Sequence, residues 1–127
     1  MAKSVHNDVL DAALNYIKSN ATSMILCNAQ PTTYTEATAT YALADITIDS
    51  ADFTGPADGD TSGRKITVNA QTAVDVDATD AGGTNHVALV DVLGTKLLYV
   101  TTAPDVAVDS AGTVNFAAWD IEILDPS

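Results

Sequence analysis

The chain opens with a helical pattern of apolar positions. Between about residues 7 and 20, apolar side chains recur at the three- and four-residue intervals that place them on one face of a helix. Asn7 is the predicted N-cap, and Asp8, Asp11 and Lys18 lie where they complement the helix dipole. The simpler interpretation is a helix that packs on its own sheet, and the alternative is an arm that docks on a partner. The apolar stripe consists of Val9, Leu10, Ala13, Leu14 and Ile17.

From residue 23 onward the pattern changes to short apolar runs and to the two-residue alternation of strands. Segments 86–92 and 96–102 are apolar almost throughout and are separated by Gly94-Thr95, which predicts a hairpin of two central strands covered on both faces. Segments 52–63 and 80–85 are rich in Gly and Asp and are predicted to be surface loops. The remaining predicted strands are 23–27, 44–48, 65–69, 74–77, 113–116 and 119–123, with 106–108 as a further edge candidate.

Together these elements predict a mainly β protein. We expect an antiparallel β-sandwich or small barrel of about seven to nine strands, with one N-terminal α-helix. The 127 residues correspond to a single domain, in which 1–6 is a candidate tail, 7–20 the helix and 23–125 the β-sandwich. Segment 32–42 is rich in Thr and Ala and is either a loop or a short helical turn.

The strongly negative net charge of the chain argues against some classes of binding partner. The chain has 17 Asp and Glu residues but only 5 Lys and Arg residues, which gives a net charge of −12. Proteins that bind nucleic acid or anionic membranes present basic surfaces, so neither partner is expected. No apolar run is long enough to cross a membrane, and residues 1–6 do not resemble the start of a signal peptide.

The sequence contains none of the common nucleotide-binding, serine-hydrolase or zinc-protease motifs. Cys27 could act as a nucleophile with His6 or His86 as its base, but their spacing does not connect them, and a buried structural cysteine is the simpler interpretation. The pairs Asp75/Asp77 and Asp58/Asp60 could each supply the two carboxyl groups of a glycosidase, but alternating Asp side chains on a solvated face are the simpler interpretation. We therefore expect no catalytic residues and no enzymatic activity.

One loop resembles the first half of a calcium-binding loop. Asp58, Asp60 and Ser62 alternate before Gly63, as oxygen ligands of Ca²⁺ do. The position that should carry a bidentate Glu is Asn69, and the following segment has the pattern of a strand. The loop is thus either a weak Ca²⁺ site, the one cofactor candidate, or a turn whose carboxylates cap backbone amides.

Seven blocks follow one another along the chain: HNDVLDAAL (6–14), CNAQPTTYTEAT (27–38), SADFT (50–54), DGDTSGRK (58–65), NHVALVD (85–91), LLYVTT (97–102) and WDIEILDP (119–126). In this order they resemble a family of small virion structural proteins of tailed bacteriophages. The resemblance covers nearly the whole chain, and Gly55-Pro56-Ala57 is extra length relative to the family pattern. It implies a non-enzymatic part of the virion.

The resemblance implies a capsid decoration or cement protein on the outside of the phage head, made in the bacterial cytoplasm. It would stabilise the lattice by contacts with the major capsid protein and with copies of itself. The alternatives are a tail, collar or head-fibre protein that contacts the host surface, and a carbohydrate-binding β-sandwich module, which would need exposed aromatic side chains. Trp119 is expected in the core. The candidate interface residues are Val9, Leu10, Leu14, Ile17, Tyr34 and Tyr41.

Overall fold

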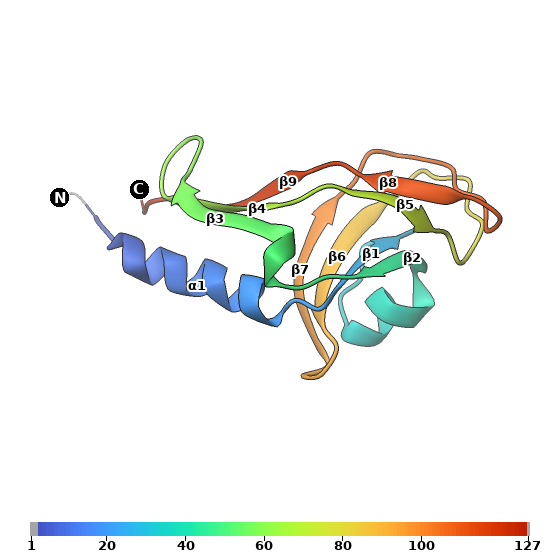
Figure 1. Cartoon of the computed structure of the whole chain (residues 1–127), viewed down its shortest axis with the longest axis horizontal. Coiled ribbons are helices and arrows are strands. Elements are labelled where there is room, and N and C mark those ends of the chain that lie inside the picture. Colours follow the sequence, from blue (N-terminus) through green and yellow to red (C-terminus); the bar gives the residue numbers. More distant parts are fainter. Residues whose placement is uncertain (1–2, 127) are drawn as a thin grey trace.

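The computed structural model describes residues 3–126, and within them it contains nine β-strands and one long helix (Figure 1). The predicted antiparallel, mainly β architecture with an N-terminal helix is confirmed, and the sheets do not close into a barrel. The elements are α1 (Asn7–Asn20), β1 (Ser23–Cys27), β2 (Ala42–Thr47), β3 (Phe53–Asp58), β4 (Arg64–Val68), β5 (Gln71–Asp75), β6 (His86–Asp91), β7 (Lys96–Thr102), β8 (Thr113–Phe116) and β9 (Trp119–Ile123), with a π-helical turn at Glu36–Thr40 and a 3-10 turn at Ser50–Asp52.

The strands form two layers that are joined on one side and open on the other. The first layer has the order β2-β1-β6-β7. In the second layer β4 pairs with β9, and β5 pairs with β8. Because β4 leads into β5 and β8 leads into β9, the two pairings follow one another and form one long antiparallel pair across the molecule (Figure 1). A bridge between Ala44 and Val76 connects β2 to the end of β5. On the opposite side β7 and the β8–β9 strand are edges, so the layers are not hydrogen-bonded to each other there.

The continuous apolar runs of β1 and β6 arise because both faces of these strands are covered. Successive side chains of a strand point to opposite faces. Met24 and Leu26 therefore belong to the core between the layers, whereas Ile25 and Cys27 belong to a second, smaller core. The segment around the π-helical turn covers that second core, chiefly through Ala37.

Helix α1 packs against β3 and β4 through part of the predicted apolar stripe, whereas Val9 and Ala13 of that stripe are exposed. Leu10 and Leu14 are buried, which agrees with a helix that packs on its own sheet. The predicted N-cap was wrong by one residue: the cap is His6, whose ring Nδ1 accepts a hydrogen bond from the backbone N–H of Asp8 at 3.0 Å. An imidazole nitrogen can accept in the same way as the oxygen of the usual capping residues.

Three strand predictions needed correction. Residues 53–58, predicted as loop, form β3. This strand is at an edge, which tolerates the missing amide donor of Pro56, and its pairing with β4 shifts register between Thr54 and Ala57. Strand β7, predicted to be central, is an edge strand whose side chains are only partly buried. The candidate strand 106–108 is reduced to one bridge, between Asp80 and Val108.

Replacing Leu14 tests how firmly α1 is held by the sheet. Because Leu14 is completely buried, Leu14→Ala should lower the free energy of unfolding by about 2–5 kcal/mol, the cost of lost burial and of a cavity. Val9→Ala on the same helix is the matched control, since Val9 is 60% exposed, and should change stability by less than about 0.5 kcal/mol. Urea denaturation followed by circular dichroism measures both, and equal losses would contradict this packing.

Candidate functional site

An apolar cleft lies on the open side of the described chain, where the two layers are not joined. Its volume is about 640 Å³, within the range of roughly 300–1,000 Å³ that is usual for binding pockets. One wall is formed by the end of β7 and the segment after it (Thr101–Pro104), and the other by β8 and the start of β9 (Thr113–Asp120). Leu26 of β1 and Val87 of β6 also line it.

An aromatic pair spans the two edges beside this cleft. The rings of Tyr99 in β7 and Trp119 in β9 are stacked, with centroids 5.8 Å apart and planes inclined by 28°. Trp119 packs on the main core, as predicted, but it also lines the cleft. Its indole Nε1 is buried and finds no hydrogen-bond acceptor among residues 3–126. This indole N–H is thus an unpaired donor within the packed wall, with almost no surface open to the cleft.

A buried asparagine fixes the segment that closes one end of the cleft. Asn85 is only 2% exposed; its backbone oxygen accepts from Ala103 N–H at 3.0 Å, and its side-chain Nδ2 donates to the Val106 oxygen at 3.1 Å. Gly82 also approaches this segment: its φ is +87°, and a Cβ there would lie 3.0 Å from the backbone of Val106. The cleft therefore has a defined end. The sequence analysis treated residues 80–85 only as a loop, and Asn85 immediately before an apolar run was the available signal.

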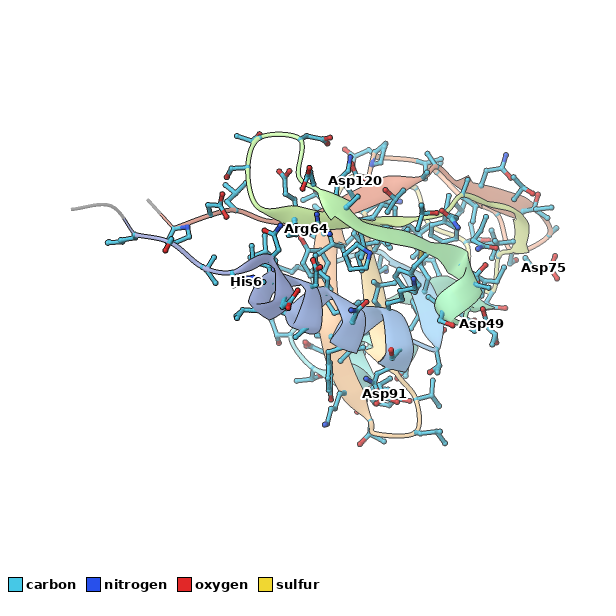
Figure 2. The ribbon with its side chains drawn as sticks, turned by 60° about the vertical axis from the view of Figure 1, so that its left-hand side comes forward. His6, Asp49, Arg64, Asp75, Asp91 and Asp120 are labelled. Atoms are coloured by element: carbon cyan, nitrogen blue, oxygen red, sulfur yellow. The ribbon has the colours of Figure 1, made fainter. Side chains whose placement is uncertain are left out.

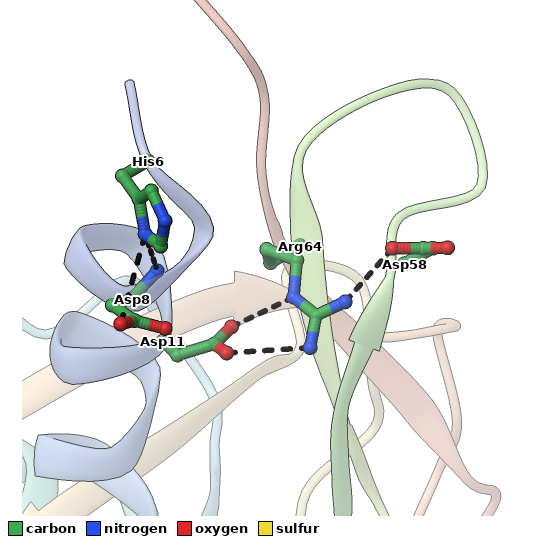
Figure 3. A network of polar contacts seen from close by, with 5 residues as sticks. All are labelled: His6, Asp8, Asp11, Asp58 and Arg64. Atoms are coloured by element: carbon green, nitrogen blue, oxygen red, sulfur yellow. Dashed lines mark hydrogen bonds and ion pairs between the residues drawn. The ribbon is translucent and has the colours of Figure 1, made fainter.

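Basic side chains form ion pairs with Asp residues inside the fold and so connect its elements. Arg64 is the main example (Figure 3): its Nε and Nη2 donate to the two carboxylate oxygens of Asp11 at 2.8 and 3.3 Å, and its Nη1 donates to Asp58 at 2.8 Å. The hydrogen bonds and charges of these carboxylates raise the pKa of the Arg64 guanidinium. This network ties α1 to β3 and β4. Acidic side chains, in contrast, lie on several sides of the molecule (Figure 2).

The calcium candidate is organised by neighbouring cations and backbone groups. Asp58 pairs with Arg64, and Asp60 pairs with Lys65 at 2.7 Å. The Ser62 hydroxyl accepts a hydrogen bond from a backbone amide that follows β9. Among residues 3–126 there is no group of three or more His, Cys, Asp or Glu side chains suited to a metal ion. The Asp58 and Asp60 carboxylates thus bind cationic side chains, and not the backbone amides that the turn interpretation expected them to cap.

Glu122, which the sequence analysis left out, is the residue around which this loop is folded. Its Oε1 accepts a hydrogen bond from the Thr61 amide at 3.2 Å. At Gly63, φ is +70°, and any Cβ would collide with the backbone of Ile123. The Gly-rich composition of the loop thus reflects its close approach to β9.

The cysteine and one of the histidines are brought together by strand pairing but lack the properties of a catalytic pair. Cys27 and His86 are opposite each other in the β1–β6 register. The Cys27 thiol is fully buried, is 3.7 Å from the Ala37 carbonyl oxygen, and has its pKa raised by burial to about 11. His86 Nδ1 is 2.8 Å from the Thr84 oxygen. Because the thiolate is the nucleophilic form, the arrangement favours a structural cysteine.

The two carboxyl groups that influence each other are not the pair singled out in the sequence. Burial, together with a hydrogen bond and charge repulsion from Asp77, raises the pKa of Asp45 in β2. Asp45 and Asp77 are both exposed residues and neither lines the cleft. Asp75 lies on β5 opposite Thr113. The arrangement does not join the carboxyl groups of Asp75 and Asp77 to a cleft.

Most of the candidate interface residues contribute to the core. Leu10 and Leu14 are buried inside this chain and are therefore not available to a partner, while Val9 remains exposed. Ile17 is partly buried against the main core, and Tyr34 and Tyr41 are partly buried against the second one. The most exposed large apolar side chain among residues 3–126 is one that the sequence analysis missed, Leu93, which is 94% exposed at the tip of the β6–β7 hairpin.

Comparisons with known proteins found no match to a family model, to a curated protein or to a solved structure. Within residues 3–126, no helix has both the length and the apolar character that crossing a membrane requires.

Thiol chemistry tests the buried state of Cys27. A rise of the thiol pKa from 9.0 to about 11 reduces the thiolate fraction at pH 8 about a hundredfold, and burial limits access further. We expect the native protein to react with Ellman's reagent at least about a hundredfold more slowly than the protein in 6 M guanidinium chloride. Comparable rates in the two states would show that Cys27 is accessible in the native fold.

The Asp45–Asp77 contact predicts a pH-dependent stability. Because folding raises the pKa of Asp45, the folded state holds that proton more tightly, and stability falls as the pH rises from the unfolded pKa of about 3.9 through the folded pKa. Asp45→Asn should therefore stabilise the protein at pH 7, by less than about 1 kcal/mol at this exposed position, and have no such effect below pH 3. Asp75→Asn is the charge-matched control, and denaturation at both pH values measures the difference.

Proposed function

We propose that this protein is a structural component of a bacteriophage virion, bound to the outside of the head as a decoration protein. Its activity in this role is the formation of protein–protein contacts that hold the capsid lattice together. The proposal begins from the ordered sequence blocks, which extend over both the helix and the strands.

The observation that carries the proposal is the open apolar cleft between β7 and β8–β9. A partner that binds in this cleft would bury apolar surface that is open to solvent in the isolated chain. Exposed Val92 and Leu93 at the β6–β7 tip offer a second apolar contact, at the far end of these strands from Thr102. Two such features on one small domain suit a protein that bridges neighbouring subunits.

The distribution of charge also fits a densely packed coat. Arg64 and Lys65 are paired with Asp residues, and Lys18 donates to the uncharged Gly55 oxygen at 2.8 Å, so three of the cations are engaged within the fold. The surface that remains is strongly acidic, with a net charge of −12 for the chain. Such a surface keeps a protein soluble at high local concentration and repels the packaged nucleic acid.

A tail, collar or head-fibre position is the alternative within the virion, and the number of copies distinguishes it. The carbohydrate-binding alternative is less favoured, because Tyr34 and Tyr41 pack against the second core instead of forming an exposed platform.

The copy number in purified particles of the phage that encodes this chain tests the proposal. Quantitative mass spectrometry against the major capsid protein should give one copy per capsid subunit or a simple fraction of it, because a decoration protein repeats with the lattice. An abundant host protein quantified in the same particles serves as the control for contamination. A few copies per particle would indicate the tail, collar or a vertex, and absence from the particles would refute a structural role.

A further inference from the structure

The cleft is bordered by two strand edges that pair with no further strand among residues 3–126. Strand β7 pairs with β6 on one side only, and β8 and β9 pair with β5 and β4 on one side only. An edge strand presents backbone N–H and C=O groups at every second residue, which an additional strand can bind. The cleft wall from Thr113 to Asp120 is eight residues long, or about 26 Å at the usual rise of a strand.

The surface between these edges is suited to the alternating side chains of an extended peptide. Most of the lining residues are apolar, among them Val114, Phe116, Ala117 and Ala118. Hydroxyl-bearing Thr101, Thr102 and Thr113 stand at its margins, within the two edge strands.

The charge of the cleft indicates the charge of its occupant. Of the described residues that line the cleft, Asp120 alone is charged. Its carboxylate is already bound by Lys65 Nζ at 3.3 Å and by the Thr67 hydroxyl at 2.7 Å. Among the described residues, the unpaired charge nearest the cleft is therefore that of exposed Asp105, which lies between the lining residues Pro104 and Val106. Lys and Arg are absent from the lining, so a segment with basic side chains would complement this region whereas an acidic one would be repelled.

We propose that the cleft binds an extended segment of another protein, about six to eight residues long, with alternating apolar side chains and at least one Lys or Arg. The segment adds as a strand to the free edge of β7 or of β8–β9, and its apolar side chains fill the space between the layers. The inference concerns the recognition chemistry of the cleft and is tested separately from the virion role.

A display library of random twelve-residue peptides, selected on the purified full-length protein, is the first test. The enriched sequences should combine alternating apolar residues with Lys or Arg. The strongest one, made synthetically, should alter the fluorescence of Trp119, which is the single tryptophan of the chain and lines the cleft. Hydrogen exchange should then show amides of β7 or of β8–β9 protected by the peptide.

Matched variants assign the binding to the cleft. Ala118→Phe fills the cleft from its wall and should weaken the peptide at least tenfold, whereas Ala12→Phe, on the exposed side of α1, should leave its affinity unchanged. Asp105→Lys should weaken it severalfold, and Asp125→Lys, which makes the same charge change near the C-terminal end, should weaken it less. Circular dichroism and thermal unfolding establish that each variant is folded.

Several results would overturn the proposal. It fails if selection yields no peptide whose affinity depends on Ala118, if the enriched peptides are acidic or lack apolar residues, or if no edge-strand amide is protected. It also fails if sedimentation shows that a second copy occupies the cleft, through a dimer that Ala118→Phe abolishes, or if native mass spectrometry finds a small apolar molecule bound there instead. The copy number of the protein in particles tests only the virion role, so no value of it would support the peptide proposal if these tests failed.

Discussion

The pairing of β1 with β6, buried on both faces, is the interaction on which the rest of the structure depends. Met24 and Leu89 pair in the register of these strands and are both completely buried. The neighbouring Ile25 and Ala88 point to the other face and require the covering segment around Ala37. A one-residue change of register would exchange the two faces, so this pair fixes which elements can pack on each side.

The two sides of the molecule differ in how the layers built around this pair are connected. On one side the bridge from β2 to β5 joins the layers, and α1 covers β3 and β4. On the other side the layers meet only through side chains such as the Tyr99–Trp119 pair, and the apolar cleft lies beside it. The open side therefore combines free strand edges with an apolar cleft.

The few basic side chains of this acidic protein connect elements of the fold. The few cations are placed where they hold elements together, as Arg64 holds α1 and as Lys65 connects Asp60 with Asp120. Hydrogen bonds from Thr67 and then Lys65 lower the pKa of Asp120, so this cleft-lining carboxyl remains ionised to lower pH than usual. Lys65 and Thr67 of β4 thus hold the Asp120 carboxylate within the fold.

The sequence alone determined the helix, most of the strands and the mainly β class, because the periods of 3.6 and two residues survive in the pattern of apolar side chains. It also indicated that Cys27 would be buried, although not that pairing would place it opposite His86. Only the tertiary structure decided that β7 is an edge, that residues 53–58 form a strand and that a cleft remains between β7 and β8–β9. These features depend on which strands become neighbours, and an apolar strand has the same local pattern whether its outer edge is paired or free.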